Sequence, residues 1–385
     1  MRKRSYIAIT GLSVAALALT ACGSSSDAGG TSTSAAGASS SASAAGGGGK
    51  VGVILPDAQT SPRWENNDRP SLKKAFDAAG VQSDIQNANG DKSKFGTICD
   101  SMIAGGVKVL MIVNLDNETG AACLKKAQGA GILTIDYDRL TLGGGAKYYV
   151  SFDNVKVGSL MGEGLTKCLT DAKKTTADIV YINGDPTDNN AALFKSGYAG
   201  FLKMDKVGAT STVGGVTYKL IGDQTGLWNA EKAGTAFEQL YTAAAGKIDG
   251  VVSANDTMAG GIIARLKANS LNGKVPVTGQ DASNEGLQAI LAGDQCMSVF
   301  KNTDLEAKAA SDLAIALLKN DGSADALATG TVKDTVLKTD VKSALATPEA
   351  IYKTNIKTVF DAGFTTAAKV CTGTYAALCA AAGIK

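Results

Sequence analysis

Short apolar runs alternate with amphipathic stretches along the chain from about residue 50 onward. In the first half this pattern predicts strands at 51–58, 81–86, 107–113 and 132–136, with helices near 66–80, 93–104 and 118–129. In the second half it predicts strands at 177–184, 217–223, 248–255 and 275–281, with helices near 190–204, 229–245 and 257–269. Strands and helices that alternate at this spacing indicate βαβ units and parallel sheets flanked by helices.

Two long stretches, one in each half, resemble each other. They are AGGVKVLMIVNLDNETGAACLKKAQGAGILTIDYD (104–138) and AAGKIDGVVSANDTMAGGIIARLKANSLNGKVPVTGQD (244–281). Both run through a strand, a turn containing Asn, a helix, a turn marked by Gly, a second strand and an acid. We therefore predict an α/β fold of two similar lobes, each a parallel sheet flanked by helices that closes its own core.

The N-terminal segment has the features of an export signal. Basic residues at 2–4 precede an apolar stretch from about Tyr6 to Leu19, which is too short to span a bilayer. The stretch ends in LTAC (19–22), which resembles the lipobox of bacterial lipoproteins, in which the cysteine is diacylated and the preceding peptide is removed. We expect residues 1–22 to be a signal peptide and Cys22 to hold the protein on the extracytoplasmic face of the cell membrane, because more than one acyl chain anchors durably.

The segment after Cys22 and the charge balance narrow the function further. Residues 23–49 are almost all Ser, Gly, Ala and Thr, a composition that cannot bury a core. We expect a flexible tether that spans on the order of 30 Å. The formal net charge is +2, and it becomes −1 once Arg2, Lys3 and Arg4 leave with the signal. This balance gives no electrostatic basis for a nucleic-acid partner.

Six cysteines remain when Cys22 is set aside, an even number for an oxidising compartment, so disulfides are expected. About fifteen pairings of six cysteines are possible. We expect Cys371 to pair with Cys379, which is close in sequence, and Cys99 with Cys123 on a neighbouring helix, which leaves Cys168 with Cys296. The sequence has no histidine and no C-x-x-C, so neither a zinc site nor a thioredoxin-like site is expected, and we expect no cofactor.

Polar residues follow most of the predicted strands. In a parallel sheet the carboxyl ends of the strands share one edge, where ligands bind. In the first half these residues are Asp57, Gln59, Arg63, Trp64, Asn114, Asp116, Asp136, Asp138 and Arg139. In the second half they are Asp185, Asp188, Asn189, Asn190, Asp223, Gln224, Trp228, Asn255, Asp256, Gln280, Asp281 and Lys301.

Two such edges that face each other would form a cleft with both donors and acceptors and with two tryptophans. This lining suits an uncharged polyol, because each hydroxyl donates and accepts at once and an indole face contacts the C–H groups of a sugar. An anionic ligand would call for an excess of bases or a glycine-rich phosphate loop, and neither phosphate-loop pattern occurs in the sequence.

Eight motifs in order along residues 50–365 carry a specific resemblance. They are SPRWENNDR, NANGD, YDRL, YYVSFDNVKVG, GDPTDNNAALF, SANDTMAGG, TGQDASNEG and AGDQCMSVFKNT. Together they resemble the xylose-binding protein family of ABC importers, within the class I (ribose/galactose-type) periplasmic sugar-binding proteins. The resemblance implies two lobes that close on one monosaccharide and deliver it to a permease. It also implies three hinge crossings, near 152–155, 300–303 and 330–345, which assign 50–154 with 302–330 to one lobe and 155–301 with 331–385 to the other.

The resemblance also implies the sugar contacts. Carried over by position, they are Arg63, Asp138, Arg139, Asn190, Trp228, Asn255, Asp281 and Lys301, to which we add Trp64 beside Arg63. Asp138 and Arg139 would grip hydroxyls, whereas Asp136 would serve the backbone or the strand edge. Bland alternatives remain. Asp138 and Arg139 could form an exposed ion pair, and Lys301 could be solvated at the hinge. Trp228 could cap a helix surface or fill a gap between the lobes. Asn255 and Asp256 could serve as an N-cap for the helix that starts at Thr257.

The sequence thus predicts a monomeric lipoprotein that binds a sugar for an ABC importer, with xylose as the expected ligand. Glucose, galactose or arabinose are alternatives, as is a sensory role at a receptor. A glycoside hydrolase would need a general acid in an apolar setting, and the acids here alternate with Arg, Asn and Lys, so we expect no enzyme. A repressor of this fold would need a DNA-binding headpiece before residue 50, where this chain has a signal and a tether.

Overall fold

The computed structural model describes residues 49–385. The predicted signal peptide, the lipid-bearing Cys22 and all but the last residue of the tether lie outside the described residues. No helix within residues 49–385 has both the length and the apolar character needed to cross a bilayer.

The first lobe is built on a seven-stranded sheet in the order β11-β12-β5-β4-β3-β1-β2. Only β11 runs antiparallel to its neighbour. The strands are β1 (Lys50–Leu55), β2 (Gln82–Asn87), β3 (Val109–Ile112), β4 (Leu133–Tyr137), β5 (Tyr148–Phe152), β11 (Gly330–Asp334) and β12 (Thr339–Ala346). The helices are the π-helical turn η1 (Trp64–Asp68), α1 (Arg69–Ala78), α2 (Lys92–Ala104), α3 (Asn117–Gly129), α9 (Thr303–Lys319) and the short α10 (Ala324–Leu327).

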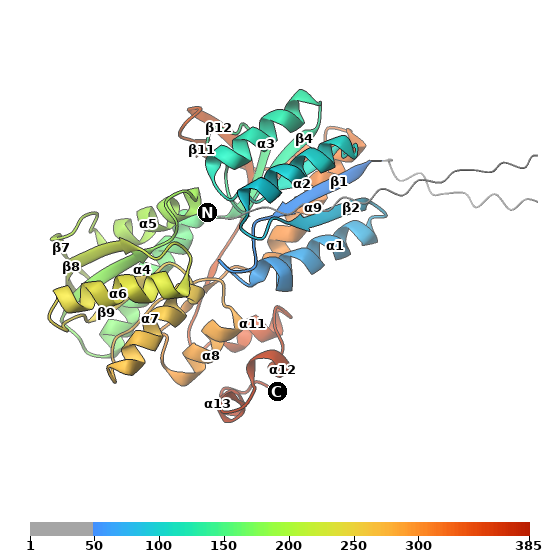
Figure 1. Cartoon of the computed structure of the whole chain (residues 1–385). Coiled ribbons are helices and arrows are strands. Elements are labelled where there is room, and N and C mark those ends of the chain that lie inside the picture. Colours follow the sequence, from blue (N-terminus) through green and yellow to red (C-terminus); the bar gives the residue numbers. More distant parts are fainter. Residues whose placement is uncertain (1–48) are drawn as a thin grey trace, which may run out of the picture. The chain divides into compact units, whose positions relative to one another are not determined.

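Both faces of this sheet are covered, so its central strands are buried on two sides, as parallel strands usually are. On one face Leu72 and Phe76 of α1 pack with Leu313 of α9. On the other face Phe95 of α2 and Leu124 of α3 pack in a separate cluster. Figure 1 shows these two helix layers on either side of the strands. The continuous burial of β3 explains why its sequence is an unbroken apolar run.

The second lobe is built on a four-stranded sheet in the order β7-β8-β6-β9, in which only β7 is antiparallel. The strands are β6 (Thr176–Asn183), β7 (Thr210–Val213), β8 (Val216–Thr225) and β9 (Gly250–Ser253). The helices are α4 (Asn154–Asp171), α5 (Asn189–Leu202), α6 (Ala230–Ala243), α7 (Asp256–Ala268) and α8 (Asn284–Ala292). A ribbon of β10 (Ser298–Phe300) and β13 (Glu349–Ile351) and the helices α11 (Lys357–Asp361), α12 (Ala367–Val370) and α13 (Tyr375–Ala381) complete the described chain.

The prediction of a continuous strand at 275–281 was wrong. This segment makes only two isolated parallel bridges, at Val277 with Val251 and at Gln280 with Val299. Pro276 has no N–H to donate to a ladder. The Thr278 hydroxyl accepts from the N–H of Ser253 and donates to its carbonyl, so a side chain takes the place of a backbone partner in the ladder.

The chain passes between the lobes at three places. The first lies between β5 and α4, and the second between β10 and α9, both where the sequence predicted them. The third was predicted too early. Residues 330–346 form β11 and β12, and β12 pairs in parallel with β5, so this hairpin belongs to the first lobe. The crossing follows Ala346, because β13 at 349–351 already pairs with β10. The alternating polarity of the hairpin fits an edge of either sheet, so the pattern alone could not assign it.

Three disulfides connect the six cysteines of the described chain, and the predicted pairing is confirmed. Cys99 on α2 bonds to Cys123 on α3. Cys168 at the end of α4 bonds to Cys296, just before β10. Cys371 bonds to Cys379 within the C-terminal helices. The long-range Cys168–Cys296 bond ties the segment that leads to the second crossing onto α4.

Candidate functional site

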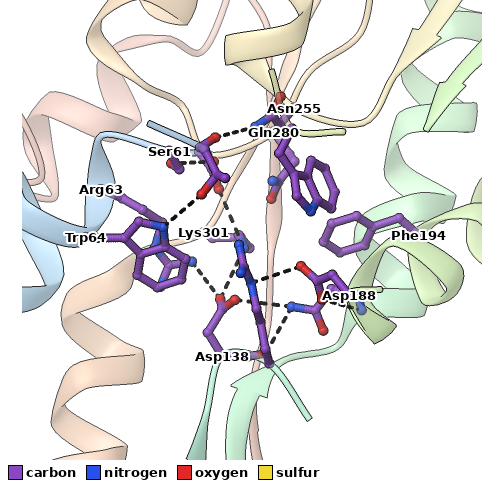
Figure 2. Close-up of a pocket in the computed structure, with 14 residues that line it drawn as sticks. Ser61, Arg63, Trp64, Asp138, Asp188, Phe194, Asn255, Gln280 and Lys301 are labelled. Atoms are coloured by element: carbon purple, nitrogen blue, oxygen red, sulfur yellow. Dashed lines mark hydrogen bonds and ion pairs between the residues drawn. The ribbon is translucent and has the colours of Figure 1, made fainter. Parts of the chain in front are cut away.

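A pocket of about 300 Å³ lies between the carboxyl edges of the two sheets (Figure 2). All nine residues predicted from the sequence as binding residues line it. Its full lining is Thr60, Ser61, Arg63, Trp64, Asp138, Arg139, Asp188, Asn190, Phe194, Trp228, Asn255, Gln280, Asp281 and Lys301. Residues separated by more than 200 positions in sequence meet here, as Ser61 and Asp281 do.

Asp138 stands directly after β4 in the left-handed region, with φ of 60°. Hydrogen bonds of its backbone groups hold it in this conformation. The N–H donates to the carbonyl of Val150, and the carbonyl accepts from the hydroxyls of Tyr149 and Ser151, each at 2.8 Å. A non-glycine residue keeps this conformation when its surroundings determine it strongly. The carboxylate is thereby fixed toward the pocket.

The Asp138 carboxylate is buried among cations. Its Oδ2 accepts from Nη1 of Arg63 at 2.7 Å and lies 3.4 Å from Nζ of Lys301. Burial alone would raise the pKa of Asp138, but the charges of Lys301, Arg63 and Arg139 outweigh it and lower the pKa to about 2. The group is therefore a permanent acceptor in the physiological range.

Arg63 is held by three carboxylates. Its Nε and Nη2 bond to both oxygens of Asp68 at 2.9 and 2.7 Å, Nη2 also bonds to Glu306 at 2.5 Å, and Nη1 bonds to Asp138. All four side chains are buried. The Tyr137 hydroxyl donates to Asp68 at 2.6 Å. Burial raises the pKa of Glu306 well above its usual range, although the Arg63 charge opposes this. Most of the five donors of Arg63 therefore serve the protein, and few are left for a ligand.

Arg139 does not pair with its neighbour Asp138. Its Nε lies 2.9 Å from Oδ2 of Asp188 in the second lobe, and its Nη1 donates to the carbonyl of Asn114. Both side chains of the Arg139–Asp188 pair are buried, so an exposed ion pair is excluded. Trp64 lies beside this group, with the guanidinium of Arg63 at 4.4 Å and that of Arg139 at 5.6 Å from its ring centroid. These cation–π contacts fix the indole at the pocket wall.

Helix α5 supplies two pocket residues, Asn190 and Phe194, which lie one turn apart on the same face. The amide of Asn190 donates to the carbonyl of Asp138 at 3.0 Å and to its carboxylate at 3.2 Å, across the two lobes. Phe194 packs edge-on against Trp228 with centroids 6.1 Å apart. In Figure 2 the rings of Trp64 and Phe194 lie on opposite sides of the group of lining residues.

The remaining second-lobe residues come from loops that follow β8, β9 and the 275–281 segment. Asn255 is the N-cap of α7, since its Oδ1 accepts from the N–H of Met258, and its Nδ2 donates to the carbonyl of Thr60 in the first lobe. Asp116 caps α3 with nearly the same backbone angles, which supports the internal repeat. Asp281 accepts from the hydroxyl of Ser61 at 2.9 Å, so both contacts join the two lobes.

Three buried polar atoms in the pocket have no hydrogen-bond partner within the described chain. They are Nε1 of Trp228, Oε1 of Gln280 and Oδ1 of Asp281. The Asp281 oxygen lies 3.5 Å from Nζ of Lys301, an ion-pair distance rather than a hydrogen bond. Buried polar groups without partners are costly in a folded protein and are rare. One donor and two acceptors therefore point to a ligand that offers both kinds of group.

Lys301 connects the two halves of the pocket. It lies at the second crossing, is 3% exposed, and faces the carboxylates of Asp138 and Asp281. Its ammonium also lies 5.6 Å from the ring centroid of Phe152 and 5.8 Å from that of Phe194. The alternative of a solvated hinge lysine is therefore excluded.

Five lining residues were missed by the sequence prediction: Thr60, Ser61, Asp188, Phe194 and Gln280. Phe194 could have been found from its spacing of four residues from Asn190 on a helix. Asp188 and Gln280 were among the polar residues after strands but were not singled out. Thr60 and Ser61 carry no signal, because short hydroxyl residues in a loop are common.

Other polar residues after the strands serve the protein itself. Asp57 accepts from the backbone of Gln59 and Thr60 and so shapes the loop before Arg63. Asp136 accepts from the N–H and the hydroxyl of Thr141, which confirms the expectation that it serves the backbone. Asp223 pairs with Lys195 outside the pocket.

The charges in the pocket lining balance. Arg63, Arg139 and Lys301 are matched by Asp138, Asp188 and Asp281. Equal numbers of acidic and basic side chains leave no surplus formal charge to attract an ionic ligand. The chemistry of the site is therefore that of a neutral ligand that both donates and accepts hydrogen bonds between aromatic walls.

Comparisons of the sequence with known proteins agree on one family. The sequence profile of the periplasmic binding protein domain matches residues 51–322. The chain is 35% identical over 317 residues to the D-xylose-binding periplasmic protein of Escherichia coli strain K12, with 82% of this chain and 90% of that protein covered. It is 33% identical over 325 residues to the multiple sugar-binding periplasmic receptor ChvE of Rhizobium radiobacter, again covering 82% and 90%.

Comparison of the structure with solved structures gives the same result. An ABC transporter solute-binding protein from Clostridium phytofermentans with bound β-D-glucose superposes with a TM-score of 0.71 at 28% identity, covering 83% of this chain and 99% of that chain. A carbohydrate transporter solute-binding protein from Chloroflexus aurantiacus in complex with D-glucose gives a TM-score of 0.70, also at 28% identity, covering 83% and 97%.

Proposed function

Because the chain belongs to the periplasmic binding protein family, among the class I sugar-binding proteins, we propose that it binds a monosaccharide between its lobes and delivers it to an ABC importer. The observation that carries this proposal is the set of three unpartnered polar atoms of Trp228, Gln280 and Asp281 in the pocket. Sugar hydroxyls satisfy both kinds of atom, because each hydroxyl is a donor and an acceptor. Two aromatic walls provide the apolar contact that the C–H faces of a sugar ring need.

We propose D-xylose as the ligand. Two relatives support this choice, the D-xylose-binding proteins of Escherichia coli and Haemophilus influenzae, at 35% and 34% identity. The alternative is another aldose such as glucose, galactose or arabinose, since the ChvE relative is named a multiple sugar-binding receptor and the Clostridium phytofermentans structure contains β-D-glucose.

Binding would work by closure of the lobes over the sugar. Four contacts join the lobes at the pocket rim: Asn255 to the Thr60 carbonyl, Ser61 to Asp281, Arg139 to Asp188 and Asn190 to Asp138. A micromolar affinity corresponds to about −8 kcal/mol. A handful of hydrogen bonds to charged groups, at roughly 1.5–3 kcal/mol each, supplies this after the cost of ordering.

The first test is a titration of intrinsic tryptophan fluorescence with D-xylose, D-glucose, D-galactose, L-arabinose and myo-inositol. Both tryptophans of the chain, Trp64 and Trp228, line the pocket, so occupancy should change the emission directly. We expect saturation by D-xylose at micromolar concentration and weaker binding of the hexoses. Saturation by a hexose alone would identify the alternative ligand. No response and no heat of binding with any of the sugars would refute the proposal.

Two further parts of the proposal concern location and chemistry. We propose that Cys22 carries the lipid anchor, which metabolic labelling with a radioactive fatty acid would detect in the wild type and not in Cys22→Ser.

We also propose that the protein performs no catalysis, because Asp138 is ionised and the other pocket acids are paired. Incubation with xylosides should leave them intact, and release of free sugar would contradict this. The alternative partner is a receptor, on which the protein would dock in place of the importer.

A further inference from the structure

The loop at 280–283 holds two of the unpartnered pocket atoms in a strained backbone. Asp281 has φ of 97° and Ala282 has φ of 49°, and neither residue is glycine. Left-handed conformations of ordinary residues persist only where the surroundings determine them, and they concentrate at functional sites. The loop presents the side chains of Gln280 and Asp281 to the pocket.

Every residue of this loop has a backbone hydrogen bond that holds it. The carbonyl of Gln280 accepts from the N–H of Asp256 at 3.1 Å, and the N–H of Asp281 donates to the carbonyl of Val299 at 2.9 Å. The N–H of Ala282 donates to Oγ of Ser298 at 3.0 Å, and the N–H of Ser283 donates to Oδ2 of Asp256 at 2.9 Å. Three of these four bonds lead to Asp256, directly or through the Ser298 hydroxyl.

The Asp256 carboxylate is the centre of this network. It accepts from Nε2 of Gln295 at 2.7 Å and from Oγ of Ser298 at 2.8 and 3.0 Å, in addition to the Ser283 N–H. It is 4% exposed, and it does not line the pocket. Glycines lie on two sides of it. A Cβ atom at Gly279 or Gly286 would come within 2.1 or 2.2 Å of its oxygens.

The helix that Asp256 begins does not explain this arrangement. The N-cap of α7 is the preceding residue, Asn255, whose Oδ1 accepts from Met258, so the carboxylate of Asp256 is not used as a cap. Burying a carboxylate costs free energy unless hydrogen bonds compensate, and all the donors that compensate here belong to the loop or to the β10 segment that supports it. An aliphatic residue would fill the space without holding any of them.

We propose that Asp256 is a positioning residue for the sugar site, which fixes the 280–283 loop and so aims Gln280 and Asp281 at the ligand. This inference rests on the proposed sugar-binding function. Asp256 would not contact the sugar itself, because it bonds only to backbone groups and to side chains that support the loop. Replacing its carboxyl acceptors leaves the pocket lining chemically intact but frees the loop to leave its left-handed conformation.

The test compares Asp256→Asn with Asp294→Asn, measured by fluorescence or calorimetric titration of the purified protein with D-xylose. Asp294 is also a buried acid on the segment before β10, but it bonds to Asn272 and Lys267 and makes no contact with the loop. We expect Asp256→Asn to weaken binding at least tenfold, because an amide in its place presents a donor to the Ser283 N–H or to the Gln295 amide. Asp294→Asn should bind within twofold of the wild type.

A double-mutant cycle separates positioning from general loosening. If Asp256 acts through Asp281, the loss caused by Asp256→Asn should be at least threefold smaller in an Asp281→Asn background. Loosening of the lobe would instead give the same factor in both backgrounds, and that result would overturn the inference. So would wild-type affinity in Asp256→Asn.

If Asp256→Asn does not fold, Ser298→Ala takes its place. This variant removes the bridge to the Ala282 N–H and keeps the Asp256 side chain, and we expect at least threefold weaker binding. Binding within twofold of the wild type would then overturn the inference. Absence of sugar binding by the wild type would overturn the proposed function and this inference with it, whereas wild-type binding with unaffected variants would overturn this inference alone.

Discussion

Replacing Arg63 by alanine should damage the fold more than a ligand contact would. The guanidinium makes four hydrogen bonds to Asp68, Glu306 and Asp138, and all three carboxylates are buried. Breaking a buried pair by removing one partner costs about 3–5 kcal/mol, because a charge is left uncompensated. A folded domain has about 5–15 kcal/mol of stability in total.

Other partners of the three carboxylates limit the loss of folding free energy in Arg63→Ala. In Arg63→Ala, Asp138 keeps Lys301 at 3.4 Å, and Asp68 keeps the Tyr137 hydroxyl at 2.6 Å. Glu306, whose pKa burial already raises well above the usual range, can take up a proton. The expected loss is therefore that of one broken buried pair, about 3–5 kcal/mol at pH 7.

Urea unfolding at pH 7 measures this loss, with Arg69→Ala as the matched control. Arg69 lies six residues further on and pairs with Glu65 by two hydrogen bonds, but these side chains are 31% and 35% exposed. An exposed pair contributes about 0–1 kcal/mol. If Arg63→Ala lost sugar affinity yet unfolded within about 1 kcal/mol of Arg69→Ala, Arg63 would be a ligand contact and not the support of Asp138, and the argument would fail.

Three further predictions concern the pocket and the core. Burial raises the pKa of Asp136 to about 7, with the charge of Asp334 adding to it and the bonds from Thr141 opposing it; the folded state therefore keeps a proton that the unfolded state loses, and stability should fall as pH rises from about 4 to 7. Asp136→Asn should reduce this slope in thermal unfolding measured across that range, and an unchanged slope would contradict the assignment. In Gly184→Ala the new Cβ would lie 2.0 Å from the Trp228 ring, so the indole must move and D-xylose affinity should fall at least tenfold, about 1.4 kcal/mol; calorimetric titration beside a melting curve tests this, and unchanged affinity would remove Trp228 from the site. Asp281→Asn should weaken binding at least tenfold in the same titration, and a change under twofold would show that its free oxygen does not meet the sugar.

Much of the fold could be predicted because local pattern and tertiary structure agree. β3 is apolar throughout because both sheet faces are covered, and Asp116 and Asn255 cap the helices α3 and α7 that follow β3 and β9. The 330–346 hairpin was assigned to the wrong lobe. Its alternation of polar and apolar residues indicates half-buried strands, but it does not indicate which of the two sheets they join. Its assignment depends on the pairing of β12 with β5, a contact between residues almost 200 positions apart.

Nine of the fourteen residues that line the pocket could be predicted from the sequence, but their hydrogen-bond and ion-pair partners could not. Position after a strand put Asp138, Arg139 and Asp281 among the candidates, and the family resemblance selected them from the other polar residues at the sheet edges. It could not show that Arg139 pairs with Asp188 across the lobes, or that Arg63 is occupied by Asp68 and Glu306, because Glu306 lies within a helix that offers no loop signal. Partners fixed by long-range packing leave no local pattern.

The division of polar groups between the lobes bears on how closure would be driven. The first-lobe groups are organised by partners in the protein, as Arg63 is by Asp68 and Glu306. The unpartnered atoms, those of Trp228, Gln280 and Asp281, all belong to the second lobe. A ligand shifts an equilibrium only by its differential affinity for the two states. In the proposed closure, a sugar held first by the first lobe would gain the second-lobe contacts only on closing, and these three atoms would supply that difference. Their loss should therefore weaken closure more than the initial encounter.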